Sequence, residues 1–193
     1  MRGWYSRGYL PHFDEPETIQ FITFRLADSM PKAFLDACAD ALRHGEIDEQ
    51  ERREKIEYYL DQGHGACWLK NPTIAHMVED SLRHFDGERY CLLAWCVMPN
   101  HVHALAEMVE SHPLEEVIHS WKSYSAHQIN RLLKRTGRVW QPEGFDRFMR
   151  GPLHLARTVA YIEENPVVAG LVASAFDWPY SSARFHDEPR EDY

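Results

Sequence analysis

The sequence has 193 residues, of which 44% are hydrophobic and 12% aromatic, so we expect one sizeable core and a single domain over residues 1–193. It has no run of 18 apolar residues and no signal-peptide stretch near its start, which predicts a soluble, cytoplasmic protein without a membrane partner. The net charge of −9 argues against a protein that coats nucleic acid without specificity. Four cysteines without a C-x-x-C pair indicate reduced, buried thiols and not a thiolate metal site.

The first part of the chain predicts an irregular tail, one strand and two helices. In residues 1–18, glycine and proline interrupt aromatic and basic residues, a mixture that either contacts nucleic acid or packs over a sheet. Residues 19–26 are β-branched and aromatic, which predicts a strand, and residues 32–43 predict a helix. Residues 44–65 are acidic and helix-prone, and we interpret them as an insertion with no evident catalytic purpose.

The remaining chain alternates helices with apolar strands. We expect a helix from Asn71-Pro72 to Gly87, followed by strands over 89–97 and 101–108 that a short turn joins. A helix over 114–135 and a strand or strand-loop over 139–149 come next. The last predicted helix begins at Pro152 and is ended by Pro166, and residues 173–193 form a C-terminal extension. This order predicts an α+β fold in which a mainly antiparallel central sheet is covered by helices on one face.

Two histidines separated by one hydrophobic residue open the strand expected over 101–108. In a strand, His101 and His103 project to one face and Val102 to the other, so the two imidazoles form a platform of two nitrogen donors. So short a motif also occurs as two exposed or hydrogen-bonded histidines that bind nothing. His101 and His103 are therefore candidate metal ligands that need support from the rest of the chain.

The last predicted helix carries a polar face. Tyr161 and Asn165 are four residues apart, so their side chains share one side of the helix, and His154 and Arg157 continue that side toward its start. The alternatives are a half-buried aromatic residue with a solvated hydroxyl and an asparagine that ends a helix before Pro166.

Two segments resemble single-tyrosine transposases. Residues 95–103 are similar to their histidine-hydrophobe-histidine (HUH) motif, and residues 160–172 resemble their catalytic-tyrosine helix. The group that the chain resembles is the REP-associated tyrosine transposases, which are related to the IS200-like transposases. Further similar segments are residues 7–13, 140–147 and 180–182. The resemblance implies the ferredoxin-like sandwich of HUH endonucleases.

What this resemblance implies is a metal-dependent endonuclease and strand transferase for single-stranded DNA that bears hairpins, such as REP-like palindromic repeats. His101, His103 and the amide oxygen of Asn165 would hold one divalent ion, either Mg²⁺ or Mn²⁺. Tyr161 would attack the scissile phosphate and form a 5′-phosphotyrosine intermediate. Relatives act as monomers or homodimers, and such an enzyme associates with the nucleoid when bound to DNA.

A basic stretch offers candidates for DNA contacts. Residues 117–150 contain seven basic residues against two acidic ones, although the chain as a whole is acidic. Each candidate has the alternative of an ordinary surface charge or, for tryptophan, a packed core residue. The candidates are Arg7, Lys122, Arg131, Arg138, Trp140, Arg147, Arg150 and Arg157.

Two other functions remain open from the sequence. One is a single-stranded DNA-binding or regulatory protein that keeps the fold without turnover. The other is an unrelated metal hydrolase, which would need a carboxylate beside the histidines, and Glu107 is the nearest candidate in the sequence.

Overall fold

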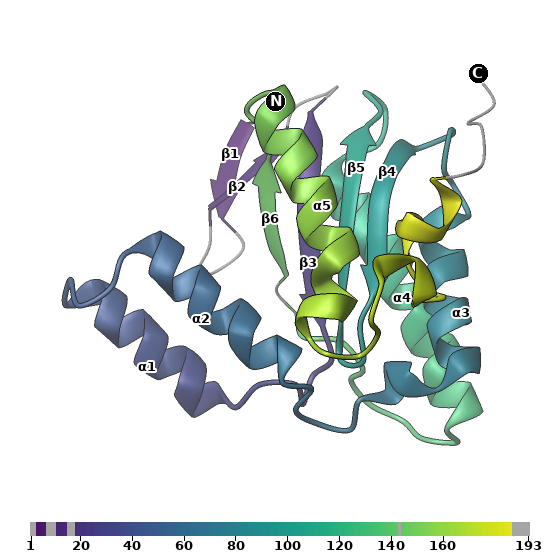
Figure 1. Cartoon of the computed structure of the whole chain (residues 1–193), viewed down its shortest axis with the longest axis horizontal. Helices are drawn as coiled ribbons and strands as arrows, with labels where there is room; N and C mark the ends of the chain where they lie inside the picture. Colours follow the sequence, from purple (N-terminus) through teal and green to yellow (C-terminus); the bar gives the residue numbers. More distant parts are fainter. Residues whose placement is uncertain (1–2, 7–10, 15–17, 143, 187–193) are drawn as a thin grey trace.

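A four-stranded antiparallel sheet forms the centre of the protein in the computed structural model, which describes residues 3–6, 11–14, 18–142 and 144–186. Figure 1 shows the sheet with α5 crossing in front of it. Its strands, in spatial order, are β4 (Tyr90–Val97), β5 (His101–Met108), β3 (Ile19–Arg25) and β6 (Phe145–Phe148). The α+β class and the mainly antiparallel sheet are confirmed.

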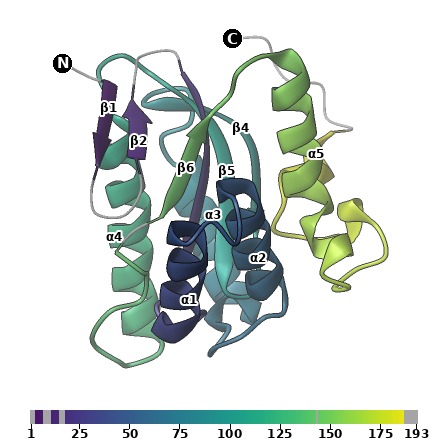
Figure 2. The same ribbon diagram turned by 90° about the vertical axis from the view of Figure 1, so that its left-hand side faces the viewer.

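Helices cover both faces of this sheet, so the prediction of a single covered face is wrong. α3 (Pro72–Arg83) and α4 (Leu114–Leu132) pack on one face, and α5 (Pro152–Val168) crosses the other, as the edge-on view in Figure 2 shows. β5 is buried along both faces: Val102 and Ala104 belong to the larger core, and Leu105 packs under α5. A continuous apolar run is typical of such a doubly covered strand.

The acidic segment 44–65 contains one helix, which pairs with the helix predicted over 32–43 to form a hairpin beside the sheet. α1 (Lys32–Arg43) and α2 (Glu49–Asp61) project from the body in Figure 1. α2 begins at a capping box, in which Asp48 accepts from the Glu51 amide and the Glu51 carboxylate accepts from the Asp48 amide. Its far end is fixed to the body, because Nδ2 of the buried Asn100 donates to the carbonyls of Leu60 and His64.

The amino-terminal tail contains two strands where an irregular segment was expected. β1 (Gly3–Ser6) and β2 (Pro11–Asp14) form a separate antiparallel pair. Aromatic residues favour extended backbone, and a proline at the first position of an edge strand removes no ladder bond that the sheet needs. Arg7, predicted to contact DNA, lies outside the described residues.

Pro166 does not end α5, contrary to expectation. The helix continues to Val168, and Gly170, with φ +68°, follows it in the left-handed conformation. The Leu171 amide donates to the Pro166 carbonyl and the Gly170 amide to the Val167 carbonyl, which is the Schellman pattern. A proline in the final turns costs one hydrogen bond, and this cap closes the helix two residues later.

The carboxyl-terminal part of the described chain covers the β4 edge of the sheet. Single turns of 3₁₀-helix at Trp68–Lys70, Ala175–Asp177 and Ser182–Phe185 complete the structure. The Val97 amide donates to the Tyr180 carbonyl, and the Ser182 hydroxyl donates to Glu163 of α5, which ties this segment to both β4 and α5. None of the helices in the described ranges is long and apolar enough to cross a membrane.

Candidate metal centre and catalytic tyrosine

The two histidines lie side by side on the face of the sheet that α5 covers. His101 and His103 begin β5 and are each 1% exposed, and Val102 points into the core on the opposite face. The Nε2 atoms of His101 and His103 are 3.1 Å apart. The alternation expected from the sequence therefore produces two converging imidazole nitrogens.

Each imidazole is oriented by a partner at its other nitrogen. Oδ1 of Asn100 lies 2.7 Å from His101 Nδ1, and the amide group of Asn100 donates elsewhere, so Oδ1 accepts the Nδ1 proton and leaves Nε2 of His101 unprotonated. Thr23 faces His103 across the β3–β5 ladder, and its hydroxyl lies 2.7 Å from His103 Nδ1. A hydroxyl can donate or accept, so Thr23 allows His103 to present Nε2 either with a proton or as a free lone pair.

Burial keeps both imidazoles neutral. Removal from water lowers the pKa of His103 to about 3. Burial also lowers the pKa of His101 well below its usual value, with smaller contributions from His103 and Arg25. Neutral imidazoles are the form that binds metal ions.

α5 crosses this histidine face with Tyr161 directly over the pair. The ring of Tyr161 lies 5.4 Å from that of His103 and 6.0 Å from that of Phe21, centroid to centroid. α5 runs antiparallel to β5 in Figure 1, so its carboxyl-terminal end lies over the end of the sheet where His101 begins β5. One helical turn beyond Tyr161, about 5.4 Å along the axis, brings Asn165 toward His101.

The polar atoms that α5 directs into this site have no hydrogen-bond partner among the described residues. Oδ1 of Asn165 and the hydroxyl of Tyr161 are both buried and unpaired, and Asn165 is 1% exposed. Unpaired buried polar atoms are rare and costly, and they accumulate where a ligand or ion is absent. A site that joins the histidines to Tyr161 and Asn165 requires the final helix to cross the histidine face of the sheet, and α5 does so.

α2 adds two carboxylates that sequence reasoning did not include in the site. Glu57 and Asp61 lie one turn apart, and Oδ1 of Asp61 is 3.8 Å from His101 Nε2. Burial, followed by the charge of Glu57, raises the pKa of Asp61 to about 7, and burial raises that of Glu57. Burial also raises the pKa of Tyr161, and the charges of Glu57 and Asp61 raise it further, so both carboxylates act on this hydroxyl.

The donor set fits a divalent ion. The two Nε2 atoms lie 3.1 Å apart, a spacing that either a hydrogen bond between the rings or a shared cation can fill, and the buried Oδ1 of Asn165 on α5 has no partner among the described residues. In the described ranges, His, Cys, Asp and Glu side chains alone form no three-membered metal cluster. The fit therefore depends on the amide of Asn165, a ligand outside those four types.

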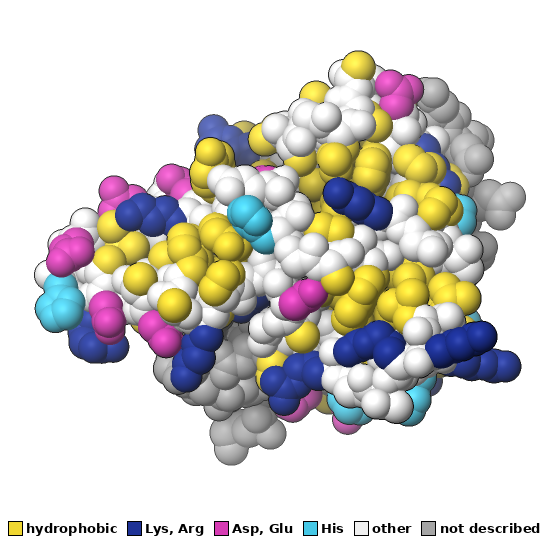
Figure 3. Space-filling view, turned by 90° about the horizontal axis from the view of Figure 1, so that it is seen from below, with side chains coloured by type: hydrophobic (Ala, Val, Ile, Leu, Met, Phe, Trp, Pro, Cys, Tyr) yellow, Lys and Arg dark blue, Asp and Glu magenta, His cyan; other side chains and the backbone are white. Residues whose placement is uncertain are grey.

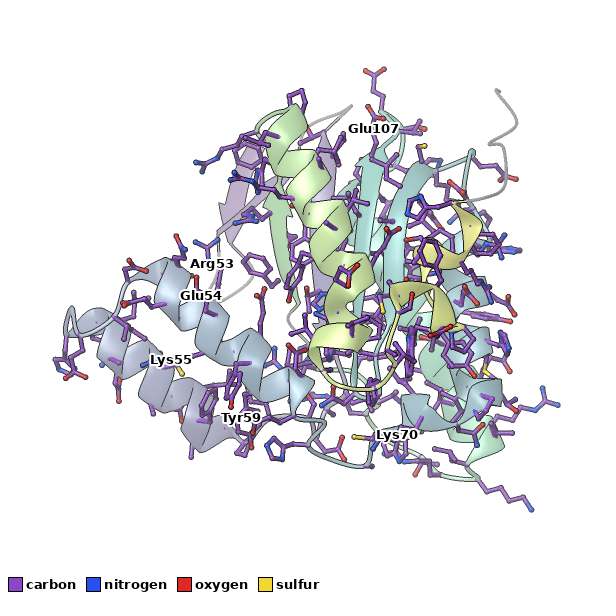
Figure 4. All side chains as sticks on the ribbon, in the orientation of Figure 1. Arg53, Glu54, Lys55, Tyr59, Lys70 and Glu107 are labelled. Atoms are coloured by element: carbon purple, nitrogen blue, oxygen red, sulfur yellow. The ribbon has the colours of Figure 1, made fainter. Side chains whose placement is uncertain are left out.

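A groove of about 340 Å³ leads to Tyr161 between α2, α5 and the β6 edge of the sheet. Figure 4 shows Arg53 and Glu54 on α2 at this side of the molecule. Three arginines and two phenylalanines line this groove. Arginines bind anionic groups and phenylalanine rings stack on aromatic ones, so the groove suits a ligand that carries both kinds of group. The groove is lined by Phe21, Gln50, Arg53, Glu54, Glu57, Phe145, Arg147, His154, Arg157, Thr158 and Tyr161.

Some residues predicted to contact DNA lie at this groove and others do not. Arg147 and Arg157 line it, and Arg150 lies 5.4 Å from the Phe148 ring at the end of β6. Trp140 is 4% exposed and its indole nitrogen donates to Ser125, so of the two alternatives for this candidate the structure shows the packed core residue and not the DNA contact. Lys122 is a structural residue, because its ammonium group donates to the carbonyls of Gln141 and Pro142.

Two further predicted arginines belong to the opposite side of the sheet. Arg131 lies in the last turn of α4, and Arg138 follows in the loop after it. Figure 3 shows Lys and Arg side chains gathered at the lower right of the view from below, away from the α1–α2 hairpin on the left. The basic stretch 117–150 is therefore divided between two faces, and only part of it reaches Tyr161.

Glu107 cannot complete a metal site with the histidines. Figure 4 shows it at the opposite end of β5 from the start of the strand. Four strand positions separate it from His103, a distance of about 13 Å. The metal-hydrolase alternative therefore loses Glu107, and the carboxylates beside the histidines are Glu57 and Asp61 of α2.

Four functional residues were missed at the sequence level for different reasons. Thr23 is eighty residues from the histidine it orients, and Asn100 has the chemistry of an ordinary turn residue. Glu57 and Asp61 lie on a helix in which only Leu60 is buried, so no apolar stripe indicated which side would face the sheet. The one available signal was the four-residue spacing of the two carboxylates, which places them on one side of a helix.

Comparison with known proteins places the chain in a family. A family model described as "Transposase IS200 like" matches residues 69–165, a segment that begins after α2 and contains His101, His103, Tyr161 and Asn165. A "Putative REP-associated tyrosine transposase" of Haemophilus influenzae is 32% identical over 104 residues, which cover 49% of this chain and 58% of that protein. A "REP-associated tyrosine transposase" of Escherichia coli is 28% identical over 93 residues, covering 48% of this chain and 53% of that protein.

The fold is also that of a solved relative. The structure of a REP-associated tyrosine transposase bound to a REP hairpin matches with a TM-score of 0.57 at 16% identity, over 93% of this chain and 84% of that one. This chain spans a little over half the length of the two curated relatives. Because the family model covers about half of the sequence, the chain belongs to the family of IS200-like transposases.

Proposed function

We propose that the chain is a metal-dependent endonuclease and strand transferase that acts on single-stranded DNA bearing hairpins. The observation that carries this proposal is the position of Tyr161, whose ring contacts His103 on one side and whose helix lines an arginine-rich groove. A nucleophile, a candidate metal centre and an anion-binding groove thus meet within one chain. The names of the two curated relatives and of the solved relative agree with this substrate class.

His101, His103 and Asn165 would hold the divalent ion, and Thr23 and Asn100 would keep the two imidazoles in the ligating orientation. An ion bound there would supply Lewis-acid polarisation of the scissile phosphate. Imidazole and amide ligands suit Mn²⁺ at least as well as Mg²⁺, so we expect either ion to support the reaction.

Tyr161 performs the covalent step. Its phenolic oxygen forms a bond to the phosphorus, the bond from phosphorus to the 3′-oxygen breaks, and that oxygen leaves as a 3′-hydroxyl after gaining a proton. The phenolic proton passes to a base, and Glu57, which lines the same groove as Tyr161, is the nearest carboxylate for this role. The phosphodiester energy stays in the tyrosyl ester, so a second 3′-hydroxyl can reverse the step without a nucleotide cofactor.

Arg53, Arg147 and Arg157 would bind phosphates of the strand that enters the groove, and Phe145 offers a ring at its wall. The acidic composition of the remaining surface disfavours nonspecific binding. This division of charge favours a short, structured DNA over bulk duplex.

A gel assay tests the proposed function. End-labelled single-stranded DNA that bears a palindromic-repeat hairpin is incubated with the protein and Mn²⁺, then denatured. We expect a protein–DNA adduct that survives denaturation and disappears when EDTA replaces Mn²⁺. Tight hairpin binding without any adduct would instead identify a regulatory DNA-binding protein.

Thr23→Val tests the orientation of His103. Valine has the same shape but cannot bond to Nδ1, so the imidazole loses the contact that orients it, and we expect the Kd for Mn²⁺ to rise about tenfold to 100-fold. Isothermal titration calorimetry measures this change in protein without DNA. Thr136→Val, at an exposed loop position, is the matched control and should keep the wild-type Kd. An unchanged Kd in Thr23→Val would show that Thr23 does not orient the ligand.

Arg147→Ala tests the groove against the opposite basic face. Removal of one phosphate contact should weaken hairpin binding by about 1–2 kcal/mol. It should also reduce the slope of the logarithm of the binding constant against the logarithm of the salt concentration by about one. Fluorescence anisotropy at several salt concentrations measures both quantities. Arg131→Ala, on the α4 side of the sheet, is the control and should bind like the wild type. Equal losses in the two variants would assign DNA binding to both faces.

A further inference from the structure

The end of α2 lies against the candidate metal centre. Asp61 is the last residue of this helix, its side chain is 18% exposed, and Oδ1 lies 3.8 Å from His101 Nε2. This oxygen has no hydrogen-bond partner among the described residues. A distance of 3.8 Å between two acceptors is too long for a hydrogen bond and too short for a bridging water on the direct line.

One side chain fixes both Asp61 and His101. Asn100 donates to the carbonyls of Leu60 and His64, on either side of Asp61 in the chain, and its Oδ1 accepts from His101 Nδ1. Asn100 is completely buried. The backbone on both sides of Asp61 is therefore anchored to the residue that orients His101, which sets where the carboxylate can reach.

The atoms that converge here are nearly all acceptors. Nε2 of His101, Oδ1 of Asp61 and Oδ1 of the 1% exposed Asn165 all offer lone pairs, and neither oxygen has a partner in the described chain. His101 is the only ion-pair contact found for Asp61 in the described ranges, and its Nδ1 already pairs with Asn100. A cation among these nitrogen and oxygen atoms would give each of them a partner.

The distances from His101 to its two neighbours are compatible with one shared ion. Asp61, His101 and His103 do not by themselves form a three-membered metal cluster in the described ranges, so the shared ion needs Asn165 as well. Ligands bound at about 2.1 Å to the same ion lie at most about 4 Å apart, because that is twice the bond length. The His101–His103 distance of 3.1 Å and the His101–Asp61 distance of 3.8 Å both satisfy this limit. A carboxylate oxygen is also the ligand that Mg²⁺ and Mn²⁺ prefer over imidazole.

We infer that Asp61 is a further ligand of the divalent ion, so that the α1–α2 hairpin supplies part of the metal centre. This inference rests on the proposed metal-dependent function. It changes the interpretation of the acidic insertion, since one of its carboxylates makes the centre less positively charged and richer in oxygen. The hairpin then has a chemical role in addition to lining the groove.

Titration of Mn²⁺ into the full-length protein without DNA tests the inference. We expect Asp61→Ala to raise the Kd about tenfold to 100-fold and Asp61→Asn, whose amide oxygen can still ligate, to raise it less. Asp36→Asn, the same chemical change at an exposed position of α1, should keep the wild-type Kd. A wild-type Kd in both Asp61 variants would overturn the inference.

Two further measurements separate the possible failures. His103→Ala is titrated in parallel: if the wild type binds Mn²⁺ and His103→Ala does not, the proposed metal centre stands whatever Asp61 contributes. Thermal unfolding without metal distinguishes a ligand from a structural residue. Removal of a buried, unpartnered carboxylate should leave the metal-free Tm unchanged or raise it, and the Tm increase on adding Mn²⁺ should shrink. A lower metal-free Tm together with an undiminished Mn²⁺ response would assign Asp61 a structural role and contradict the inference.

Discussion

Tyr161→Phe is expected to abolish the denaturation-resistant DNA adduct and to slow strand cleavage by about 10⁴-fold or more. The substitution removes the only atom of this residue that can bond to phosphorus and leaves the ring that packs on His103 and Phe21. Loss of a covalent nucleophile has effects of this size because the remaining groups bind and polarise but cannot attack. Cleavage of labelled hairpin DNA under single-turnover conditions measures the rate.

The same variant should fold as well as the wild type. The Tyr161 hydroxyl is buried and makes no hydrogen bond of ordinary geometry among the described residues, and its polar neighbours are Glu57 and Asn165, so its removal costs at most a weak contact. We therefore expect an equal or higher Tm, together with wild-type hairpin binding. Tyr124→Phe, at a half-exposed position on α4, is the matched control and should form the adduct normally. An adduct formed by Tyr161→Phe would assign the covalent step to another residue.

Local periodicity was sufficient to predict the central part of the site. Strand alternation placed His101 and His103 on one face with Val102 behind them, and helical spacing placed Tyr161 and Asn165 together. Both relations concern residues within four positions of each other, where backbone geometry determines direction. Periodicity left other interpretations open for each half, and it was the resemblance to single-tyrosine transposases that indicated that the last helix had to cross the histidine face.

Relations across the fold were not available from periodicity. The hydroxyl of Thr23 meets His103 only because β3 pairs with β5 in one register, and a shift by one residue would place Thr23 on the other face. Trp140 has the composition of a base-stacking residue but packs in the core against Phe24, with ring centroids 4.8 Å apart. Composition gives the chemistry of a side chain, and tertiary packing decides whether solvent or DNA can reach it.

The acidic hairpin shows the same limit. α2 has charged residues on all sides, so the pattern predicted a solvated helix, and its position beside Tyr161 depends on two hydrogen bonds from Asn100. Those bonds join a turn residue to carbonyls about forty positions earlier in the chain. Neither the amide nor the carbonyls carry a sequence signal for this contact, so the carboxylates beside the site became evident only from the structure.

His103→Ala is expected to remove measurable Mn²⁺ binding and adduct formation while hairpin binding persists. The substitution removes one of two converging imidazoles and leaves Thr23 without its partner, so the remaining donors no longer surround an ion. The arginines proposed to bind phosphate lie in the groove on the far side of Tyr161 and are unaffected. Calorimetry with Mn²⁺ and fluorescence anisotropy with DNA, on the same preparation, measure the two properties.

A control variant and a chelation experiment distinguish loss of the metal centre from a general effect of replacing a histidine. His127→Ala, at an exposed position of α4, should retain both Mn²⁺ affinity and adduct formation. Wild-type protein in EDTA should behave like His103→Ala, binding the hairpin without cleaving it, and Mn²⁺ should restore cleavage only to the wild type. If His103→Ala cleaved DNA at the wild-type rate, the buried histidine pair would be a structural feature of the sheet, and the chemistry at Tyr161 would have to proceed with the carboxylates of α2 and the groove arginines alone.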